Sequence, residues 1–148
     1  QPHRWRYTTM LAAALEAGGL ITAEEAERRV IILENPGLVG SSRITTSLYA
    51  GLQMVLPGEI APAHRHTQSA IRLALDSHGA YTTVGGERTR MKRGDLVLTP
   101  PMVWHDHGNE GKSEMIWLDG RPCSAPSMAP SWLASSGWTV SRLSTNSR

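Results

Sequence analysis

Short runs of apolar and β-branched residues, separated by Gly and Pro, fill most of the chain after residue 30 and are typical of β-strands. The expected strands are 30–33, 45–56, 70–75, 80–84, 88–91, 95–99 and 115–118. Gly85-Gly86 joins two of these runs, and both positions tolerate the positive φ of a two-residue hairpin turn. Many short strands with tight turns, and no long helices between them, favour an antiparallel barrel or sandwich over a parallel sheet.

The first 30 residues have a helical pattern instead. A threonine at position 8 or 9 can cap a helix over residues 10–15, and Gly18-Gly19 would end it. Thr22-Ala23-Glu24-Glu25 has the form of a capping box and predicts a second helix through about residue 29. We therefore expect an all-β fold preceded by short N-terminal helices.

Length and composition fit one compact domain that folds without disulfides, because the chain has 148 residues of which 40% are hydrophobic. The single cysteine, Cys123, excludes an internal disulfide framework and fits a reducing compartment. No apolar run reaches membrane-spanning length, and the first residues lack the apolar stretch of a signal peptide. These features predict a cytoplasmic protein without a membrane partner.

The basic pI of about 9.0 has a local origin. Residues 121–148 hold three of the 15 basic side chains and none of the 13 acidic ones, so the first 120 residues are nearly neutral. Without a basic stripe, and with few aromatic residues, the chain does not fit a nucleic-acid-binding protein.

The last 28 residues also differ in texture, with eight serines and with Trp132 and Trp138 set among small residues. We expect three segments: a helical or extended arm over 1–40, a β-barrel over 41–120 and an atypical Ser/Pro-rich tail over 121–148. The tail could be an ordinary C-terminal extension. A second hypothesis is that it derives from a shifted reading frame or a truncated second domain.

Histidines supply the candidate chemistry. Four of the six form two pairs, His64 with His66 and His105 with His107. Residues one apart on an extended backbone point to the same side, so each pair offers two imidazoles together. Two such pairs predict a metal site. The alternatives are polar residues on a surface strand for the first pair and, for His107, a structural histidine bonded to a backbone carbonyl.

The spacing of these histidines resembles the two cupin motifs. Five residues separate Gly58 from His64-Arg65-His66, and Gly94 is followed at the second motif's spacing by Pro100, Met102, His105 and Asn109. Only Met102 departs from the pattern, because Gly is usual at that position. The chain is further similar to gentisate 1,2-dioxygenases and their salicylate and 1-hydroxy-2-naphthoate relatives, through residues 51–53, 56–59, 61–70, 104–109 and 117–120. This resemblance, over about residues 3–120, implies a cupin double-stranded β-helix, or jelly-roll barrel.

The resemblance also implies a ligand set. Cupins usually carry a glutamate ligand a few residues after the first histidine pair, where this chain has Ala70 and Ile71, followed by Arg72. Three neutral imidazoles would remain as ligands and leave about three open positions on the ion, as a non-haem iron site needs. The predicted ligands are His64, His66 and His105. Spacing leaves zinc, nickel and manganese open, and the resemblance favours Fe(II).

For the substrate, the resemblance implies a small aromatic hydroxy acid and O2, with gentisate opened to maleylpyruvate in aromatic catabolism. Arg72 could bind the carboxylate, and His107 could serve as a base or hydrogen-bond donor to the substrate. Gln53, Asp119 and Tyr49 match pocket positions of the family.

Other interpretations stay open at this point. Arg72 could be a solvated residue or a structural ion-pair partner, and we expect Glu59 to be a solvated turn residue. Family members have a second, C-terminal cupin domain that is not part of this sequence, and we expect a homo-oligomer. The alternative function is a non-catalytic metal-binding cupin, or a small-molecule binding module.

Overall fold

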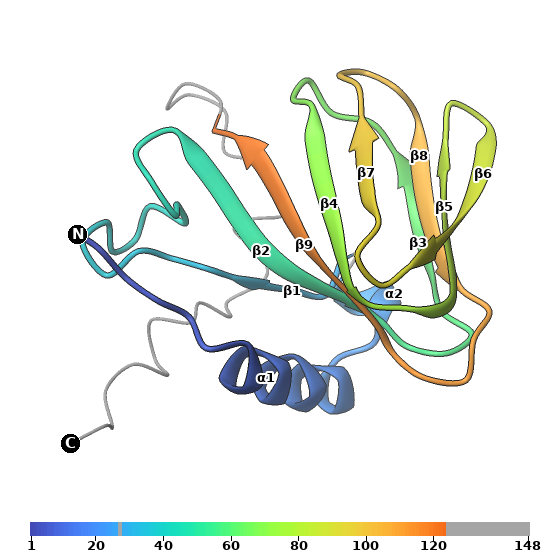
Figure 1. Ribbon diagram of the computed structural model, residues 1–148, viewed down its shortest axis with the longest axis horizontal. Coiled ribbons are helices and arrows are strands. Elements are labelled where there is room, and N and C mark those ends of the chain that lie inside the picture. The colour runs from blue at the N-terminus through green and yellow to red at the C-terminus, as the bar shows by residue number, and fades with distance from the viewer. Residues whose placement is uncertain (27, 124–148) are drawn as a thin grey trace.

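Two antiparallel sheets form the two walls of a sandwich in the computed structural model, which describes residues 1–26 and 28–123 (Figure 1). In spatial order, the five-stranded sheet contains β1 (Val30–Ile32), β2 (Leu48–Val55), β9 (Met115–Pro122), β4 (Ala70–Asp76) and β7 (Leu96–Thr99). The four-stranded sheet contains β3 (Ile60–His64), β8 (His105–Asn109), β5 (His78–Val84) and β6 (Glu87–Lys92). This arrangement confirms the expected all-β, antiparallel fold.

The β5–β6 hairpin has the predicted turn. Val84 pairs with Glu87 around Gly85 and Gly86, whose φ angles are 61° and 89°. Both values lie in the left-handed region that glycine adopts without cost, and this explains why the strands can reverse in two residues.

Helix α1 (Tyr7–Leu20) is longer than predicted, and two expectations about it are wrong. It begins after Arg6, whose side chain makes no capping hydrogen bond, and it continues through Gly18 and Gly19. The helix packs against the outer face of the five-stranded sheet, where a methyl group at Gly18 would lie 2.5 Å from the Met54 side chain. Glycine therefore allows close approach here instead of ending the helix.

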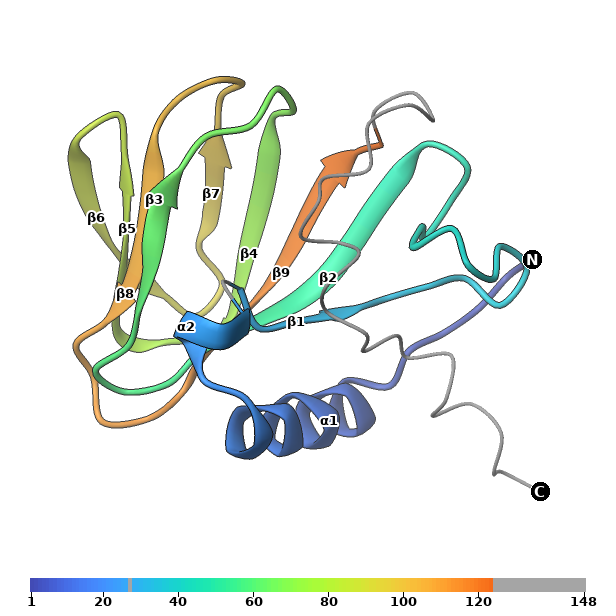
Figure 2. The same cartoon turned by 180° about the vertical axis from the view of Figure 1, so that it is seen from behind.

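Helix α2 (Ala23–Ala26) starts with the predicted capping box. The Glu25 amide donates to the Thr22 hydroxyl at 3.1 Å, and the Thr22 amide donates to the Glu25 carboxylate at 3.1 Å. The helix ends earlier than expected, because the Arg29 carbonyl already accepts a hydrogen bond from the Met54 amide of β2. Figure 2 shows α2 next to β3.

Hydrophobic residues form a core on each side of the five-stranded sheet. The outer core lies under α1, where Met10, Ala14 and Ala17 contact residues of β1, β2 and β9. The inner core lies between the two sheets and contains Val55, Ala80, Met91, Met115 and Trp117. Along β2 and β9, successive side chains alternate between these cores, so every second residue faces the interior of the sandwich.

No helix in the described part of the chain is long and apolar enough to cross a membrane. The expected tail over 121–148 falls, from residue 124 onward, outside the described residues. Residues 30–32 of the expected N-terminal arm are the edge strand β1 of the five-stranded sheet.

Candidate metal centre

Three histidines converge where β3 ends and β8 begins. His64 is the last residue of β3 and pairs in register with His105, the first residue of β8, while His66 lies two residues beyond β3. One ring nitrogen from each lies within 4.8 Å of the others. The Met102 amide donates to the His66 carbonyl at 2.7 Å, and this bond holds the β7–β8 loop against the third imidazole.

Hydrogen bonds orient two of these imidazoles. His66 Nδ1 lies 2.6 Å from the Gln68 carbonyl oxygen, and His105 Nδ1 lies 2.9 Å from the Val103 carbonyl oxygen. A carbonyl accepts, so Nδ1 carries the proton in both rings and the lone pair is on Nε2. His105 Nε2 and His64 Nδ1 are buried and have no hydrogen-bond partner among residues 1–26 and 28–123. Such unpartnered nitrogens fit a bound metal ion.

Electrostatics keep the three rings neutral, which is the form that binds metals. Burial lowers the pKa of His64 to about 2, with a further contribution from the Arg28 charge. Burial likewise lowers the pKa of His105 to about 4 and that of His66 below its usual value. Within the described chain, no carboxylate joins this group of three.

Arg72 is buried on β4, at the interior side of the five-stranded sheet. Its Nε lies 3.3 Å from an Asp119 carboxylate oxygen, and its Nη1 donates to the Thr99 hydroxyl. The arginine side chain is therefore held by an internal ion pair, as one of the alternative interpretations required. Its charge also contributes to the lowered pKa values of His66 and His105.

His107 is completely buried on β8, two residues from His105. Its ring centroid lies 5.7 Å from that of His105 and 4.8 Å from that of Trp117. Neither ring nitrogen has a hydrogen-bond partner in the part of the chain that the structure describes, and this does not support a structural histidine bonded to a carbonyl. Burial holds its pKa well below the usual value, so the ring is neutral.

The remaining predicted pocket residues also face the interior. Tyr49 and Gln53 alternate along β2 with residues of the outer core, and Asp119 lies on the same face of β9 as Trp117. Gln53 Nε2 and Trp117 Nε1 are buried without a hydrogen-bond partner among the described residues, Asp119 Oδ1 is engaged through the ion pair with Arg72, and the Tyr49 hydroxyl interacts with Arg121. Burial raises the pKa of Tyr49 to about 12 and keeps its hydroxyl protonated. The interior face of β2 and β9 thus carries several buried polar groups in addition to the histidines.

Two residues, Arg28 and Glu59, were missed or misjudged from the sequence. Arg28 donates to the Pro62 carbonyl of β3 at 3.0 Å, and its charge contributes to the lowered pKa values of His64 and His107. Glu59 is not a solvated turn residue: it forms an ion pair of 2.7 Å with Arg29, and its side chain is 21% exposed. Arg28 lies in the irregular connector before β1, and Glu59 lies in the turn between β2 and β3. Neither segment has a periodic pattern that predicts the direction of a side chain.

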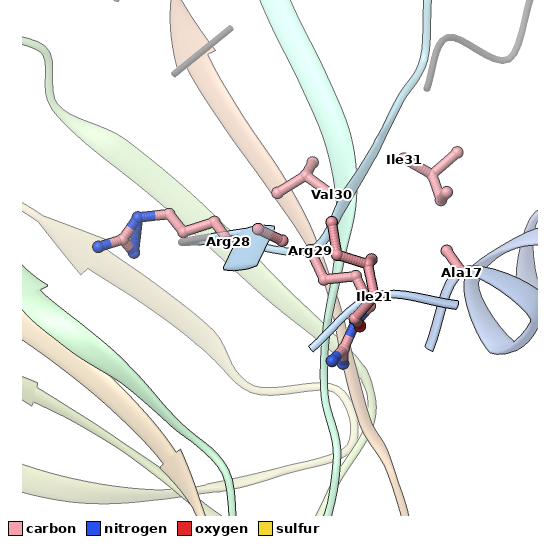
Figure 3. A pocket seen from close by; sticks show the side chains of 7 residues that line it. Ala17, Ile21, Arg28, Arg29, Val30 and Ile31 are labelled. Carbon is pink, nitrogen blue, oxygen red and sulfur yellow. The ribbon is translucent and has the colours of Figure 1, made fainter. Parts of the chain in front are cut away.

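Figure 3 shows the small pocket between α1, α2 and β1, where the Arg28 and Arg29 side chains diverge. Its apolar lining includes Ala17, Ile21, Val30 and Ile31. None of the histidines lines this pocket.

Comparison with known proteins agrees with this geometry. Residues 51–120 match the family model of the cupin domain. The chain is 63% identical over 119 residues to "Gentisate 1,2 dioxygenase 1" of Aquipseudomonas alcaligenes, covering 80% of this chain and 34% of the relative. It is 48% identical over 120 residues to a gentisate 1,2-dioxygenase of a Ralstonia species, with the same two coverages.

Among solved structures, the chain is similar to the salicylate 1,2-dioxygenase of Pseudoaminobacter salicylatoxidans, in a structure of its adducts with gentisate. The TM-score is 0.78 and the sequence identity 42%, over 82% of this chain and 33% of that one. The chain thus spans about one third of the length of these relatives. Residues 51–120 therefore resemble a cupin domain, and the chain as a whole is similar to one third of the gentisate and salicylate 1,2-dioxygenases.

Proposed function

We propose that this chain carries the metal centre of an Fe(II)-dependent, ring-cleaving dioxygenase of the gentisate type, which converts gentisate and O2 to maleylpyruvate. The observation that carries the proposal is the convergence of three neutral imidazoles, without a carboxylate among the described residues, beside a buried arginine. The residues that would hold the ion are His64, His66 and His105.

The charge balance of such a site favours an anionic chelating ligand. Neutral imidazoles leave the full double charge on a divalent ion, and Arg72 adds a cation that Asp119 balances. A hydroxy acid that binds through carboxylate and phenolate oxygens supplies the missing negative charge. Bound Fe(II) would lower the pKa of the phenol and provide an electron path between the ring and O2.

The side chains of this chain would bind and orient the acid. The charges of Arg28 and Arg72 both contribute to the lowered pKa values of His64, His105 and His107, and a guanidinium forms strong paired hydrogen bonds with a carboxylate. His107 is buried and neutral, so one ring nitrogen can accept a hydrogen bond from a substrate hydroxyl while the other donates one. Gln53 and Tyr49 offer an amide and a protonated hydroxyl to the ring substituents.

One observation favours a second function, a cupin that binds metal and aromatic acids without turning them over. Asp119 and Thr99 already engage Arg72, as in a structural ion pair. A binding module needs only the metal ion and its histidine ligands, whereas catalysis also needs the arginine to reach the substrate. A cytoplasmic location, a homo-oligomer and the three-segment division of the chain complete the proposal.

The test is anaerobic reconstitution with Fe(II), followed by measurement of O2 uptake and of the ring-cleavage chromophore. We expect uptake with gentisate, salicylate or 1-hydroxy-2-naphthoate, and none with a His105→Ala control. Stoichiometric iron without uptake on any of the three acids would leave the binding module as the function of this chain.

A further inference from the structure

We infer that the ion pair between Arg29 and Glu59 is a positioning device, which fixes the connector before β1 so that Arg28 faces the metal centre. The inference rests on the proposed function, because it concerns how an acidic substrate is bound. Arg28 would touch the substrate carboxylate, and the other two residues would act through it.

All three nitrogens of the Arg29 guanidinium donate hydrogen bonds. It is 4% exposed, and its two terminal nitrogens donate to the two Glu59 carboxylate oxygens at 3.0 and 2.7 Å. Its Nε donates to the Ile21 carbonyl at 3.0 Å. A two-pronged pair of this kind fixes the orientation of the side chain as well as its distance. The connector therefore cannot rotate without breaking three hydrogen bonds.

Glu59 in turn belongs to the framework of the metal strands. Its carboxylate accepts from the Leu56 amide at 2.7 Å, and its carbonyl accepts from the Asn109 amide at 3.1 Å. Asn109 is the last residue of β8, the strand that carries His105 and His107. The ion pair thus ties the N-terminal connector directly to the strand of the candidate site.

Arg28 takes the opposite direction from its neighbour. Figure 3 shows the Arg28 and Arg29 side chains leaving the connector in different directions. The Arg28 guanidinium donates to Pro62 of β3, two residues before His64. The hydrogen bonds of Arg29 fix the backbone of the connector, and the position of the Arg28 side chain depends on that backbone.

A partly buried ion pair adds little net stability, because an apolar pair of similar volume is often as stable. The contribution of the ion pair here is to fix the orientation of the connector and hence of Arg28. A purely structural role predicts that its loss lowers stability alone, whereas a positioning role predicts a specific loss in the binding of carboxylate ligands.

The experiment uses the chain loaded with zinc, which is redox-inert, and measures gentisate binding by calorimetry. We expect Glu59→Gln to retain one equivalent of zinc and to weaken gentisate binding about tenfold, the effect of one lost charged hydrogen bond. Hydroquinone, which is gentisate without its carboxylate, should bind to both proteins equally. Glu110→Gln, which breaks the exposed pair with Arg88, is the matched control and should change neither affinity.

The deciding comparison is made in the Arg28→Ala background. If Glu59 acts through Arg28, adding Glu59→Gln to Arg28→Ala causes no further loss of gentisate affinity. A further tenfold loss there, or an unchanged affinity in the single variant, would overturn the inference. Should Glu59→Gln not fold, Arg29→Lys keeps the charge, removes the two-pronged geometry and serves in the same comparison.

The same titrations separate the inference from the function on which it rests. Wild-type protein that holds zinc but binds neither gentisate nor salicylate contradicts the proposed function and the inference together. If the wild-type protein and the Glu59→Gln variant bind gentisate with the same affinity, only the positioning role is contradicted.

Discussion

The three convergent imidazoles make a direct prediction about metal retention. His105→Ala or His64→Ala removes one of three ligands, and we expect the purified protein to lose its metal. Arg72→Ala should keep a full equivalent, because the arginine touches Asp119 and Thr99 and not the histidine nitrogens. The measurement is metal analysis after dialysis. A His105→Ala protein that still held one equivalent would show that the ligands are elsewhere.

The position of His107 predicts a trade-off between stability and activity. Among the described residues, the buried His107 imidazole has no hydrogen-bond partner, so the free energy lost on removing it from water is not recovered. We expect His107→Leu, of similar volume, to raise the free energy of unfolding by about 1–2 kcal/mol. The same variant should lose ring cleavage while retaining metal. Chemical denaturation and O2 uptake test the two halves, and a destabilised variant would contradict the first.

Met102 provides a test of backbone strain. Its φ is 62°, in the left-handed region, and its side chain is 51% exposed, so little packing is lost on truncation. We expect Met102→Gly to increase the free energy of unfolding by about 1 kcal/mol, since a side chain in this region costs roughly that amount. Ser42, with φ 55°, offers a second position for the same change. Unchanged thermal denaturation in both variants would contradict the strain.

The sequence predicted the histidine cluster because its signal is local and periodic. Alternation along β8 places His105 and His107 on one face, and the motif spacing pairs β3 with β8. Arg28 and Glu59 were not predicted, because their directions depend on contacts between segments 30 or more residues apart. Nothing in Arg28-Arg29 alone tells which guanidinium turns inward.

At the scale of elements, strands were predicted better than helix ends. The strands alternate between two cores, so hydrophobic residues recur regularly and the turns contain Gly or Pro. The end of α1 depends instead on packing, since Gly18 faces Met54 and the gain from burying the helix exceeds the local cost of two glycines. Such tertiary contacts leave no trace in a local propensity.

The pairing of β5 with β8 predicts that Gly108 does not tolerate a larger side chain. Gly108 lies opposite Tyr81, and a methyl group there would come within 2.4 Å of the tyrosine ring. We expect Gly108→Ala to lower the free energy of unfolding by about 2 kcal/mol, the cost of overpacking. Gly120→Ala is the control, because its nearest neighbour would be the Ile71 carbonyl oxygen at 3.9 Å.

A double-mutant cycle identifies the cause of that loss. If the tyrosine ring is the obstacle, Gly108→Ala should cost much less in a Tyr81→Ala protein than in the wild type. Equal costs in the two backgrounds would point to backbone conformation instead. Urea denaturation of the four proteins gives all the required values.

For the whole molecule, the uncovered part of the five-stranded sheet is the main feature not used by the site. Helix α1 covers the outer face over β1 and β2, while β4 and β7 lie away from it (Figure 1). On these strands Ile71, Leu96 and Leu98 are 50%, 60% and 62% exposed, and Ile71 pairs in register with Leu98. Strand β7 is also the edge of its sheet. An apolar face beside an open edge favours association.

We therefore expect the isolated chain to self-associate with increasing concentration, and Leu98→Lys to reduce this association. A lysine on an edge strand replaces apolar surface and disfavours pairing between edges. The control is Val39→Lys, because Val39 is 72% exposed but lies outside the uncovered sheet. Sedimentation velocity at several concentrations compares the three proteins. If Val39→Lys dissociated the complex and Leu98→Lys did not, the contact would lie on the loop before β2, and the uncovered sheet would have no part in assembly.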